Sequence, residues 1–424
     1  MALFGQKELK AVQNYSHLSH LTCTRCHRTY PVTEVRERCD CGGILFAAYD
    51  LKAVQRTLGK PDLAARPQTL WRYHELLPIQ KESSIVSLHE GMTPLLQLPR
   101  VASQFGVPNL LVKDEGRLPS GTFKARGASV GISRAKELGV SGVAIPTNGN
   151  AGAAWALYAA RAGLPILVVM PTTAPVTPRK ECVVSGARVV TINGTIGDAG
   201  RVVREAAKRY GWYDVSTFNE PYRLEGKKTM GLEIAEQFGW SVPDVIVYPT
   251  GGGAGVVGIY KGLLELQQMG WIGAKMPRFA LIQSEGCAPL ARAFAKGERE
   301  TTRWEDPQTI AFGMRVPKPA ADYLLLDILY RTNGTVTTVS DAEVQEVRRM
   351  VGEWEGFHVC PEGAAGFAGL RRLRKAGWLT GNERVLLVNT GTGLKYIDQI
   401  ADDAREMDLA DLDLEALALP ARRA

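Results

Sequence analysis

Short, continuously apolar segments alternate with helical segments along most of this chain, and this alternation restricts its fold more than any other feature. Helical patterns follow several of these segments, for example over 152–163 and 256–270. Strands that are apolar on both faces, with helices between them, indicate a mostly parallel sheet that is covered on both sides. The chain is therefore predicted to be α/β, with ligands bound at the carboxyl ends of its strands. The expected strands are 109–116, 141–147, 165–171, 187–192, 244–250, 278–286 and 384–391.

Composition limits the broad class of protein. The chain has 424 residues, of which 45% are hydrophobic and 22% charged, which suffices for a large core in two or three domains. It contains no apolar run long enough to cross a membrane and no apolar signal segment at its start, so a cytoplasmic protein without a membrane partner is expected. The net charge of +7 is compatible with anionic small molecules as ligands, and equally with no functional meaning. No dense basic run with interleaved aromatic residues is present, so no nucleic-acid partner is predicted.

A cluster of cysteines near the start indicates a metal site. A C-x-x-C pair is followed some dozen residues later by a C-x-C pair, which is close to zinc-ribbon spacing because four thiolates can converge tetrahedrally. We predict a structural zinc ion held by Cys23, Cys26, Cys39 and Cys41. A reduced cysteine cluster without metal is the alternative, and His27 is an alternative ligand. The remaining cysteines, Cys182, Cys287 and Cys360, are expected to be small buried hydrophobes.

The segment "SGTFKARG", residues 120–127, places a lysine where helices disfavour one. Small and hydroxylic residues at 120–122 indicate a loop that ends in a helix cap, and 125–139 is predicted to be helical. Lys124 then lies in the first helical turn, where the partial positive charge of the backbone disfavours a cation. A lysine with a lowered pKa offers a neutral amine that can form a Schiff base with a carbonyl. An ordinary surface lysine is the alternative.

Other turns that follow strands carry residues suited to binding a ligand. Asn150 offers an amide at a helix start, and Thr390 offers a hydroxyl at the end of an apolar strand. The turn Gly251, Gly252, Gly253, Ala254 and Gly255 presents successive N–H groups at a helix N-terminus, which suits a phosphate. The same turn satisfies G-x-G-x-x-G, the dinucleotide fingerprint of a nicotinamide oxidoreductase, but no acidic residue follows at the expected place. A single phosphate fits better.

These residues together fit one cofactor, pyridoxal phosphate. Lys124 would hold its aldehyde, Asn150 its 3-oxygen, residues 251–255 its phosphate and Thr390 its ring nitrogen. A hydroxyl partner for the ring nitrogen suits elimination and replacement more than transamination.

Six segments then carry a resemblance to a known family: "HEGMTPLLQLPR", "LLVKDEGRLPSGTFKARGA", "NEPYRLEGKKTMGLEI", "YPTGGGAGVVGIYKGLLEL", "PEGAAGFAGL" and "LLVNTGTGLKY". In this order they resemble the threonine synthases, which are fold type II pyridoxal-phosphate enzymes of the tryptophan synthase β-like group. The resemblance covers about residues 15–400 and includes the cysteine ribbon, which many threonine synthases of this subgroup have and the shorter dehydratases lack.

The resemblance implies a fold with two open, mostly parallel sheets and an N-terminal zinc-ribbon-like module. It also implies a homodimer, as is common among fold type II relatives. The expected parts are the module at 1–50, a large cofactor-binding domain at 51–128 and 222–400, a small α/β domain at 129–221, and a tail at 401–424.

Roles for single residues follow from the same resemblance. Lys124 matches the Schiff-base lysine and Phe123 the residue against the cofactor ring, and Asn150, the glycine turn and Thr390 match the other cofactor contacts. The implied reaction is that of a carbon–oxygen lyase of threonine biosynthesis, which converts O-phospho-L-homoserine and water to L-threonine and phosphate by β,γ-elimination and replacement. The residues expected to bind the substrate phosphate are Thr147, Asn219 and Arg223.

Two departures keep alternatives open. Ala151 stands where many threonine synthases have Thr, and "FKARG" stands where many have "FKDRG". A related lyase, such as a threonine or serine dehydratase or a β-replacement enzyme, is therefore an alternative, and a zinc-ribbon binding module with a degenerate enzyme domain is another. Glu362 is expected to begin a helix, and Lys227 and Lys228 to face either substrate or solvent.

Overall fold

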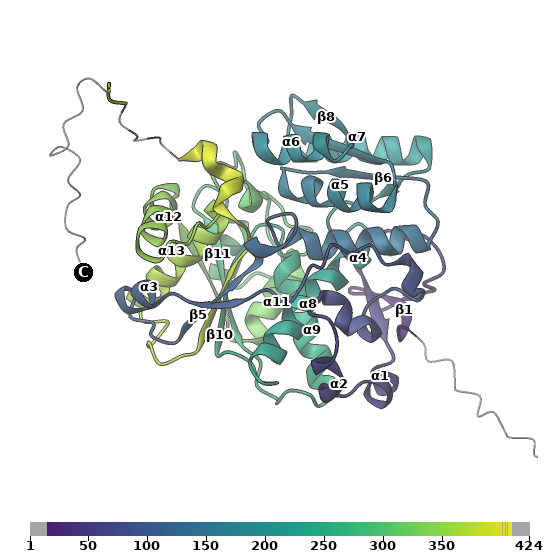
Figure 1. Ribbon diagram of the computed structural model, residues 1–424, viewed down its shortest axis with the longest axis horizontal. Helices are drawn as coiled ribbons and strands as arrows, with labels where there is room; N and C mark the ends of the chain where they lie inside the picture. Colours follow the sequence, from purple (N-terminus) through teal and green to yellow (C-terminus); the bar gives the residue numbers. More distant parts are fainter. Residues whose placement is uncertain (1–14, 401, 403, 405, 409–424) are drawn as a thin grey trace, which may run out of the picture.

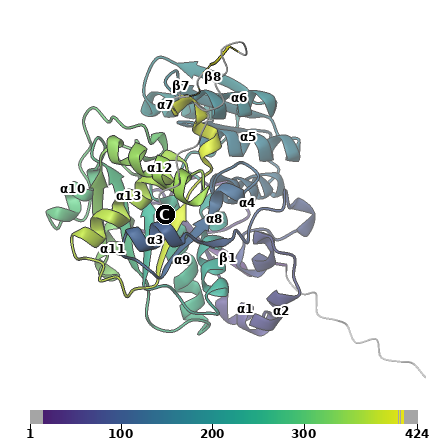
Figure 2. The ribbon, with the colours of Figure 1, turned by 60° about the vertical axis from the view of Figure 1, so that its left-hand side comes forward.

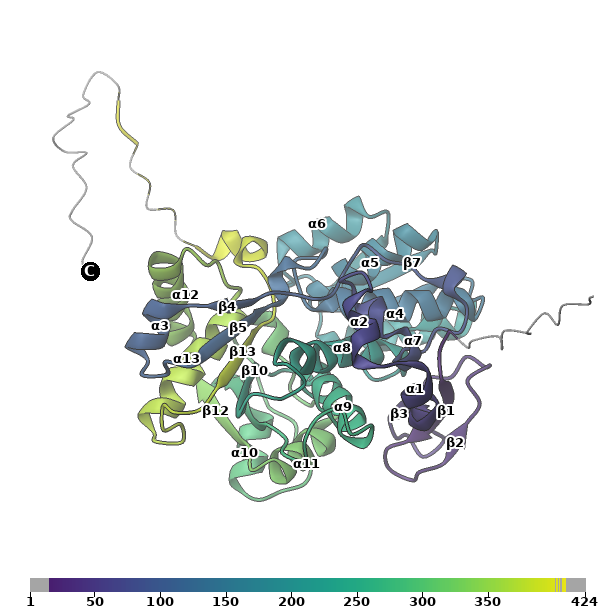
Figure 3. The same ribbon diagram turned by 60° about the horizontal axis from the view of Figure 1, so that its bottom comes forward.

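The structure, a computed structural model, describes residues 15–400, 402, 404 and 406–408, and within these residues the strands form three sheets (Figure 1). The predicted tail at 401–424 therefore lies almost entirely outside the described residues. The first sheet is small and antiparallel, with the order β2-β1-β3. Its strands are β1 (Leu18–Cys23), β2 (Thr29–Tyr30) and β3 (Leu45–Tyr49). Figure 3 shows this module at one side of the molecule, where β3 contacts α8 (Tyr222–Gln237).

The largest sheet has six strands in the order β12-β11-β10-β13-β5-β4. All neighbouring strands are parallel except β4 and β5, which pair antiparallel at one edge. The third sheet has four parallel strands in the order β8-β7-β6-β9. The strands of both sheets are β4 (Leu95–Gln97), β5 (Leu110–Asp114), β6 (Val143–Pro146), β7 (Ile166–Pro171), β8 (Arg188–Ile192), β9 (Tyr213–Asp214), β10 (Val245–Pro249), β11 (Arg278–Ser284), β12 (Thr335–Val339) and β13 (Val385–Asn389).

The helices cover both faces of each larger sheet. The other α-helices are α1 (Leu51–Thr57), α2 (Lys60–Ala64), α3 (Pro99–Gln104), α4 (Lys124–Glu137), α5 (Asn150–Ala162), α6 (Val176–Val184), α7 (Ile196–Tyr210), α9 (Ala254–Gln268), α10 (Pro289–Ala295), α11 (Asp322–Arg331), α12 (Asp341–Glu355) and α13 (Pro361–Lys375). Short 3-10 helices lie at Leu70–Leu76, Glu82–Ser84, Glu115–Arg117, Phe312–Met314 and Gly393–Gln399.

Strand β10 illustrates how the six-stranded sheet separates two apolar cores. Val245 and Val247 pack into one core with residues of α12 and α13, while Ile246 and Tyr248 pack into the other with residues of α8, α9 and α11. Successive side chains of a strand point to opposite faces, so a continuously apolar strand fills both cores. This packing confirms the premise of the prediction, which is that the parallel strands are apolar on both faces.

Helix α4 lies between the two larger sheets. It packs on α5, which covers the four-stranded sheet, and on α8, which covers the six-stranded sheet. Figures 1 and 2 show the four-stranded sheet with α5, α6 and α7 above α4 in both views. The first residue of α4 is Lys124. The lysine therefore sits where the two α/β layers meet, at the carboxyl end of β5.

All seven predicted strands are present, as β5, β6, β7, β8, β10, β11 and β13, and the predicted α/β class is confirmed. In the two larger sheets the sequence prediction missed β4, β9 and β12, and in the N-terminal module it missed β1 and β2. The three missed strands of the larger sheets have two to five residues, and β4 and β12 are sheet edges that are only half buried. An edge strand lacks the continuous apolar run that marks a buried one. The four strands of the third sheet all fall within 129–221, and the domain boundaries themselves stay a prediction.

Candidate active site

The loop that carries Lys124 is fastened to the loop that carries Thr390. The backbone N–H of Phe123 donates to the carbonyl oxygen of Thr390 at 3.0 Å, and Thr122 forms a β-bridge with Gly391. Strands β5 and β13 are adjacent and parallel, so the segments that leave their carboxyl ends run side by side. The two residues predicted to bind opposite ends of one ring are thereby brought to the same sheet edge.

Lys124 has a lowered pKa in the structure. Burial, followed by the positive charge of Arg223, lowers the pKa of the Lys124 amine from its ordinary value to about 8, against the opposite effects of Glu362 and Cys360. Its Nζ lies 4.1 Å from the centroid of the Phe123 ring. A pKa near 8 leaves a useful neutral fraction of the amine near neutral pH. The sequence predicted a lowered pKa from the helix start, and the structure adds burial and a neighbouring guanidinium as causes.

Asn150 is linked to residues far away in the sequence. Its Nδ2 donates to the hydroxyl of Tyr396 at 2.6 Å, and that hydroxyl donates to Glu362 Oε1 at 3.3 Å. The N–H of Gly313 also donates to Glu362 Oε1, at 2.7 Å. Asn150 Oδ1 and Glu362 Oε2 are buried and have no hydrogen-bond partner within the described part of the chain. Buried polar atoms are normally satisfied, so these two are available to a bound molecule.

The glycine turn at 251–255 is closely packed except at one residue. A Cβ added at Gly251 would overlap the carbonyl oxygen of Gly313, and one at Gly255 would overlap the hydroxyl of Tyr248. Gly253 has φ +76°, the left-handed region that favours glycine. A Cβ at Gly252 would meet nothing within 4 Å. The turn leads directly into α9, whose N-cap has no side-chain hydrogen bond, so its first N–H groups can hold an anion in the open space.

Thr390 is buried at the end of β13 with its hydroxyl near a thiol. Its Oγ1 lies 3.7 Å from the Sγ of Cys360, the N-cap residue of α13. The prediction that Cys360 is buried is confirmed, and burial raises the pKa of its thiol above the ordinary range. The thiol is therefore neutral at physiological pH. Thr390 thus has an uncharged neighbour, and its hydroxyl is a neutral hydrogen-bonding group.

The residues predicted to bind the substrate phosphate have different surroundings. Arg223 is 3% exposed, its guanidinium lies 5.3 Å from the Trp155 ring centroid, and its Nη1 donates to the Val215 carbonyl at 2.6 Å. Its charge acts on Lys124, so the two groups are neighbours. Burial lowers the pKa of Arg223 below its ordinary value. Its Nε has no hydrogen-bond partner among the described residues, which leaves a donor for an anion.

The hydroxyl and amide of the other two candidates are already used by the protein. Thr147 Oγ1 accepts from the N–H groups of Gly149 at 2.9 Å and Gly152 at 3.1 Å, and so shapes the turn before α5. Asn219 Oδ1 accepts from Arg38 Nε at 3.2 Å, and its Nδ2 is 3.4 Å from the Asp214 carbonyl. Asn219 thus links the segment before Arg223 to the N-terminal module.

Sequence reasoning missed the part of Glu362 and Tyr396 in this cluster. Glu362 does lie in the first turn of α13, as expected, but its carboxylate also acts on the charge of Lys124. A carboxylate at a predicted helix start was the one sequence signal for Glu362, and its burial became known only from the structure. Tyr396 gives no such signal, because its contact with Asn150 joins residues 246 positions apart.

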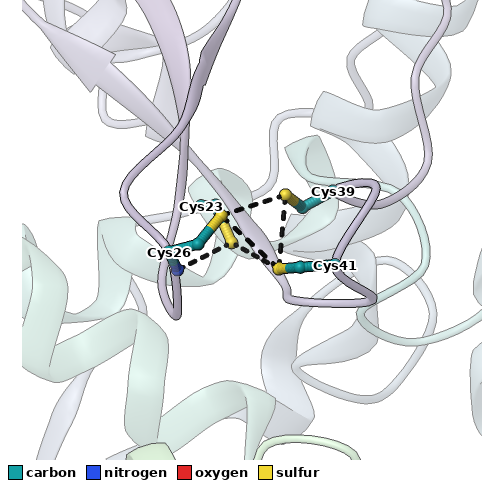
Figure 4. Close-up of side chains that lie close together, drawn as sticks. All are labelled: Cys23, Cys26, Cys39 and Cys41. Carbon is teal, nitrogen blue, oxygen red and sulfur yellow. Dashed lines mark hydrogen bonds between the residues drawn. The ribbon is translucent and has the colours of Figure 1, made fainter.

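The four predicted cysteine ligands converge. Figure 4 shows Cys23 and Cys26 facing Cys39 and Cys41, with each pair on its own loop. Their Sγ atoms all lie within 4.8 Å of one another, and the shortest separations are 3.4 to 3.5 Å. Tetrahedral zinc with bonds of about 2.3 Å places sulfurs about 3.8 Å apart, so small shifts suffice to bind it. His27 is not part of this group.

The cluster around Lys124 fits pyridoxal phosphate. It offers an amine of lowered pKa for an aldehyde, an open space at Gly252 beside free N–H groups for a phosphate, and the unpartnered Asn150 Oδ1 at a third point. A dinucleotide would need an acidic partner for its ribose that this turn lacks. These residues therefore form a candidate active site for a pyridoxal-phosphate enzyme.

Comparison with known proteins agrees with this geometry. The family described as "Pyridoxal-phosphate dependent enzyme" matches residues 86–391. The chain is 35% identical to a threonine synthase of Methanocaldococcus jannaschii over 93% of this chain and 97% of the relative. It is 36% identical to a threonine synthase of Methanosarcina acetivorans over 94% of this chain and 97% of the relative.

A solved structure shows the same fold at lower identity. Maize serine racemase superposes with a TM-score of 0.61 at 23% identity, over 77% of this chain and 90% of that chain. The similarity to the two threonine synthases extends along almost the whole of both chains, whereas the serine racemase shows only that the fold is the same. The chain belongs to the threonine synthase family of pyridoxal-phosphate dependent enzymes.

Proposed function

We propose that this protein is a pyridoxal-phosphate lyase that converts O-phospho-L-homoserine and water to L-threonine and phosphate. The observation that carries the proposal is the similarity to threonine synthases along almost the whole chain, together with a buried lysine of lowered pKa at the expected position. The reaction removes protons from two carbons, expels phosphate from a third and adds water at the middle one. One group that can repeatedly accept and return protons serves all of these steps.

Each residue has a definite task in this proposal. The cofactor, when bound, withdraws electrons from the substrate's α-carbon. Lys124 binds the cofactor between turnovers and then moves protons at the α- and β-carbons, for which its pKa of about 8 is suited. The charge of Glu362 raises the pKa of Lys124, against the effect of burial, and so keeps the protonated amine accessible. Arg223 offers its unpartnered Nε to the leaving phosphate.

The remaining residues would hold and orient the cofactor and the groups that contact the substrate. The turn 251–255 would bind the cofactor phosphate through backbone N–H groups, Phe123 would lie against the ring, and Asn150 and Thr390 would hold its two sides. Thr147 would act through the turn that it shapes, since its hydroxyl already accepts two hydrogen bonds. Asn219 would act by placing the segment that leads to Arg223.

The test is to supply the pyridoxal-loaded protein with O-phospho-L-homoserine and to measure phosphate and L-threonine together. Equal amounts of both, lost in Lys124→Ala, are expected. Phosphate with 2-oxobutyrate would instead assign an elimination of the dehydratase type. A colourless protein that binds a nicotinamide cofactor, or one without any turnover, would contradict the proposal.

We also propose that Cys23, Cys26, Cys39 and Cys41 bind a structural zinc ion. The four Sγ atoms, all within 4.8 Å of one another, support this. Four thiolates leave no open position on zinc, so the site would stabilise the module rather than take part in the reaction. The Tyr30 hydroxyl lies 3.1 Å from Cys39 Sγ and would hold that ligand in place.

Two further expectations belong to the proposal. A homodimer in the cytoplasm fits a biosynthetic enzyme of this family, and sedimentation of the loaded protein would test the oligomeric state. Within the described residues, no helix is both long enough and apolar enough to cross a membrane.

A further inference from the structure

Lys227 is a buried lysine for which the described residues supply no hydrogen-bond acceptor and no carboxylate in an ion pair. Its side chain is 1% exposed, and its Nζ has no hydrogen-bond partner among the described residues. The adjacent Lys228 Nζ is equally buried and also lacks a hydrogen bond, but it forms ion pairs with Glu225 at 2.6 Å and Glu265 at 2.8 Å, whereas Lys227 forms no ion pair within the described residues. Lysines are almost never buried unpaired, because the loss of hydration is not compensated. Something other than folding therefore accounts for the surroundings of Lys227.

The amine of Lys227 lies beside the catalytic lysine. A Cβ added at Gly127 would overlap Lys227 Nζ, so the amine occupies the space left by the missing side chain of that glycine. Gly127 is one helical turn after Lys124 on α4. Lys227 Nζ is 5.4 Å from the centroid of the Phe123 ring, and Lys124 Nζ is 4.1 Å from the same point. Both amines therefore border one aromatic ring.

Positive charge predominates around Lys227. Burial, followed by the charges of Arg223 and Lys124, lowers the pKa of Lys227 well below its ordinary value. Glu220 is the nearby carboxylate, but it already accepts the N–H groups of Tyr222 at 2.7 Å and Arg223 at 2.9 Å. Burial also raises the pKa of Glu220 to about 7, so its negative charge is incomplete at neutral pH. Arg223 is one helical turn before Lys227 on α8 and has its own unpartnered donor.

We propose that Lys227 and Arg223 form a subsite that binds the phosphate group of the substrate and then the phosphate released from it, and that the bound anion keeps the Lys227 amine protonated. The inference rests on the proposed function, since it assigns the second cation of that reaction. A phosphate ester carries close to two negative charges at neutral pH and is bound best by more than one charged donor. The cofactor's phosphate has its own place at the N–H groups of the turn 251–255, on a different helix.

The experiment compares the wild-type holoenzyme with Lys227→Met, and with Lys228→Gln as a control that is matched in burial and position. We expect Lys227→Met to raise the KM for O-phospho-L-homoserine and the inhibition constant of inorganic phosphate by roughly 10- to 100-fold, the effect of one charge-assisted hydrogen bond. The dissociation constant of pyridoxal phosphate should stay unchanged. Lys228→Gln should lower thermal stability but leave both phosphate-dependent constants near their wild-type values.

Thermal unfolding of the pyridoxal-loaded proteins, in which the cofactor fills the turn 251–255, gives a second readout that needs no turnover. Without added phosphate, Lys227→Met should be at least as stable as wild type, because it removes an unpaired buried amine. Inorganic phosphate should raise the Tm of wild type and raise it much less in Lys227→Met.

The outcomes separate the inference from the proposed function. If Lys227→Met weakens cofactor binding and leaves the KM and phosphate inhibition unchanged, the amine serves the cofactor and the inference is wrong. It is equally wrong if no phosphate-dependent quantity changes. If wild type forms no threonine but its stabilisation by phosphate depends on Lys227, the subsite stands and the proposed reaction fails.

Discussion

Arg126 and Glu115 are joined by two parallel hydrogen bonds, from Nε to Oε2 at 2.6 Å and from Nη2 to Oε1 at 2.7 Å. Both side chains are fully buried. The same guanidinium donates to Glu233 on α8 at 2.7 Å, and Glu233 pairs with Lys113 on β5 at 3.0 Å. Since Arg126 follows Lys124 by two residues, this network fixes the start of α4 against the carboxyl end of β5 and against α8.

Arg126→Met should destabilise the protein by about 3–5 kcal/mol, because it leaves buried carboxylates without their partner. Unfolding in urea measures the loss. Arg331→Met is the control, since its ion pair with Asp327 is 65% and 43% exposed and should contribute less than about 1 kcal/mol. Equal losses in the two variants would mean that the network does not anchor the helix.

The lowered pKa of Lys124 predicts how the cofactor-free protein takes up pyridoxal phosphate. The neutral amine is the reactive form, and its fraction grows about tenfold per pH unit below the pKa and levels off above it. The rate of uptake should therefore rise up to about pH 8 and then flatten. Absorbance follows the uptake, and borohydride reduction with peptide mapping locates the modified lysine. A rate that keeps rising to pH 10, as for a free lysine derivative, contradicts this prediction.

Glu362→Gln should lower the pKa of Lys124 further. The carboxylate stabilises the protonated amine, so its removal favours the neutral form and moves the plateau of the uptake profile to lower pH by about one unit. The amide oxygen can still accept from Gly313, which preserves the local backbone. Glu353→Gln on α12, where the side chain is 62% exposed, should leave the profile in place.

Substitutions at two neighbouring glycines should have different effects, one on cofactor binding and the other on stability. Gly252→Ala places a methyl group in open space, so it should leave the free energy of unfolding nearly unchanged and weaken pyridoxal phosphate binding by about tenfold or more. Gly251→Ala meets the Gly313 backbone and should destabilise the protein by about 1–3 kcal/mol. Urea unfolding and a cofactor titration of each variant test this. Unimpaired cofactor binding in Gly252→Ala would place the phosphate elsewhere.

The cysteine cluster predicts one zinc ion per chain. Cys41→Ser should reduce the bound zinc, measured by elemental analysis after dialysis, and lower the Tm of the protein. His27→Ala should retain the metal, because this histidine is not part of the converging group. Loss of zinc from the histidine variant would show that His27 is a ligand after all.

Several features of the site could be predicted because they are local in sequence. Lys124 at a helix start, the glycine turn at 251–255 and the C-x-x-C pair depend on residues a few positions apart. Of the two departures from the family pattern, Ala125 is buried in the apolar core between α4, α5 and the four-stranded sheet, and Ala151 is partly buried and packs against that core. The convergence of the second cysteine pair on the first depends instead on the pairing of β1 with β3.

The sequence by itself determined the α/β class, the positions of the buried parallel strands along the chain and the candidate lysine, because apolar periodicity and turn residues act over short distances. Only the tertiary structure decided that Lys124 is buried beside Arg223, and both the burial and this charge lower the pKa of its amine. It also decided that Tyr396 meets Asn150 and that Lys227 Nζ has no hydrogen-bond partner among the residues that the structure describes. These outcomes depend on which distant charged and polar groups meet in the folded chain, and a local pattern carries no information about such meetings.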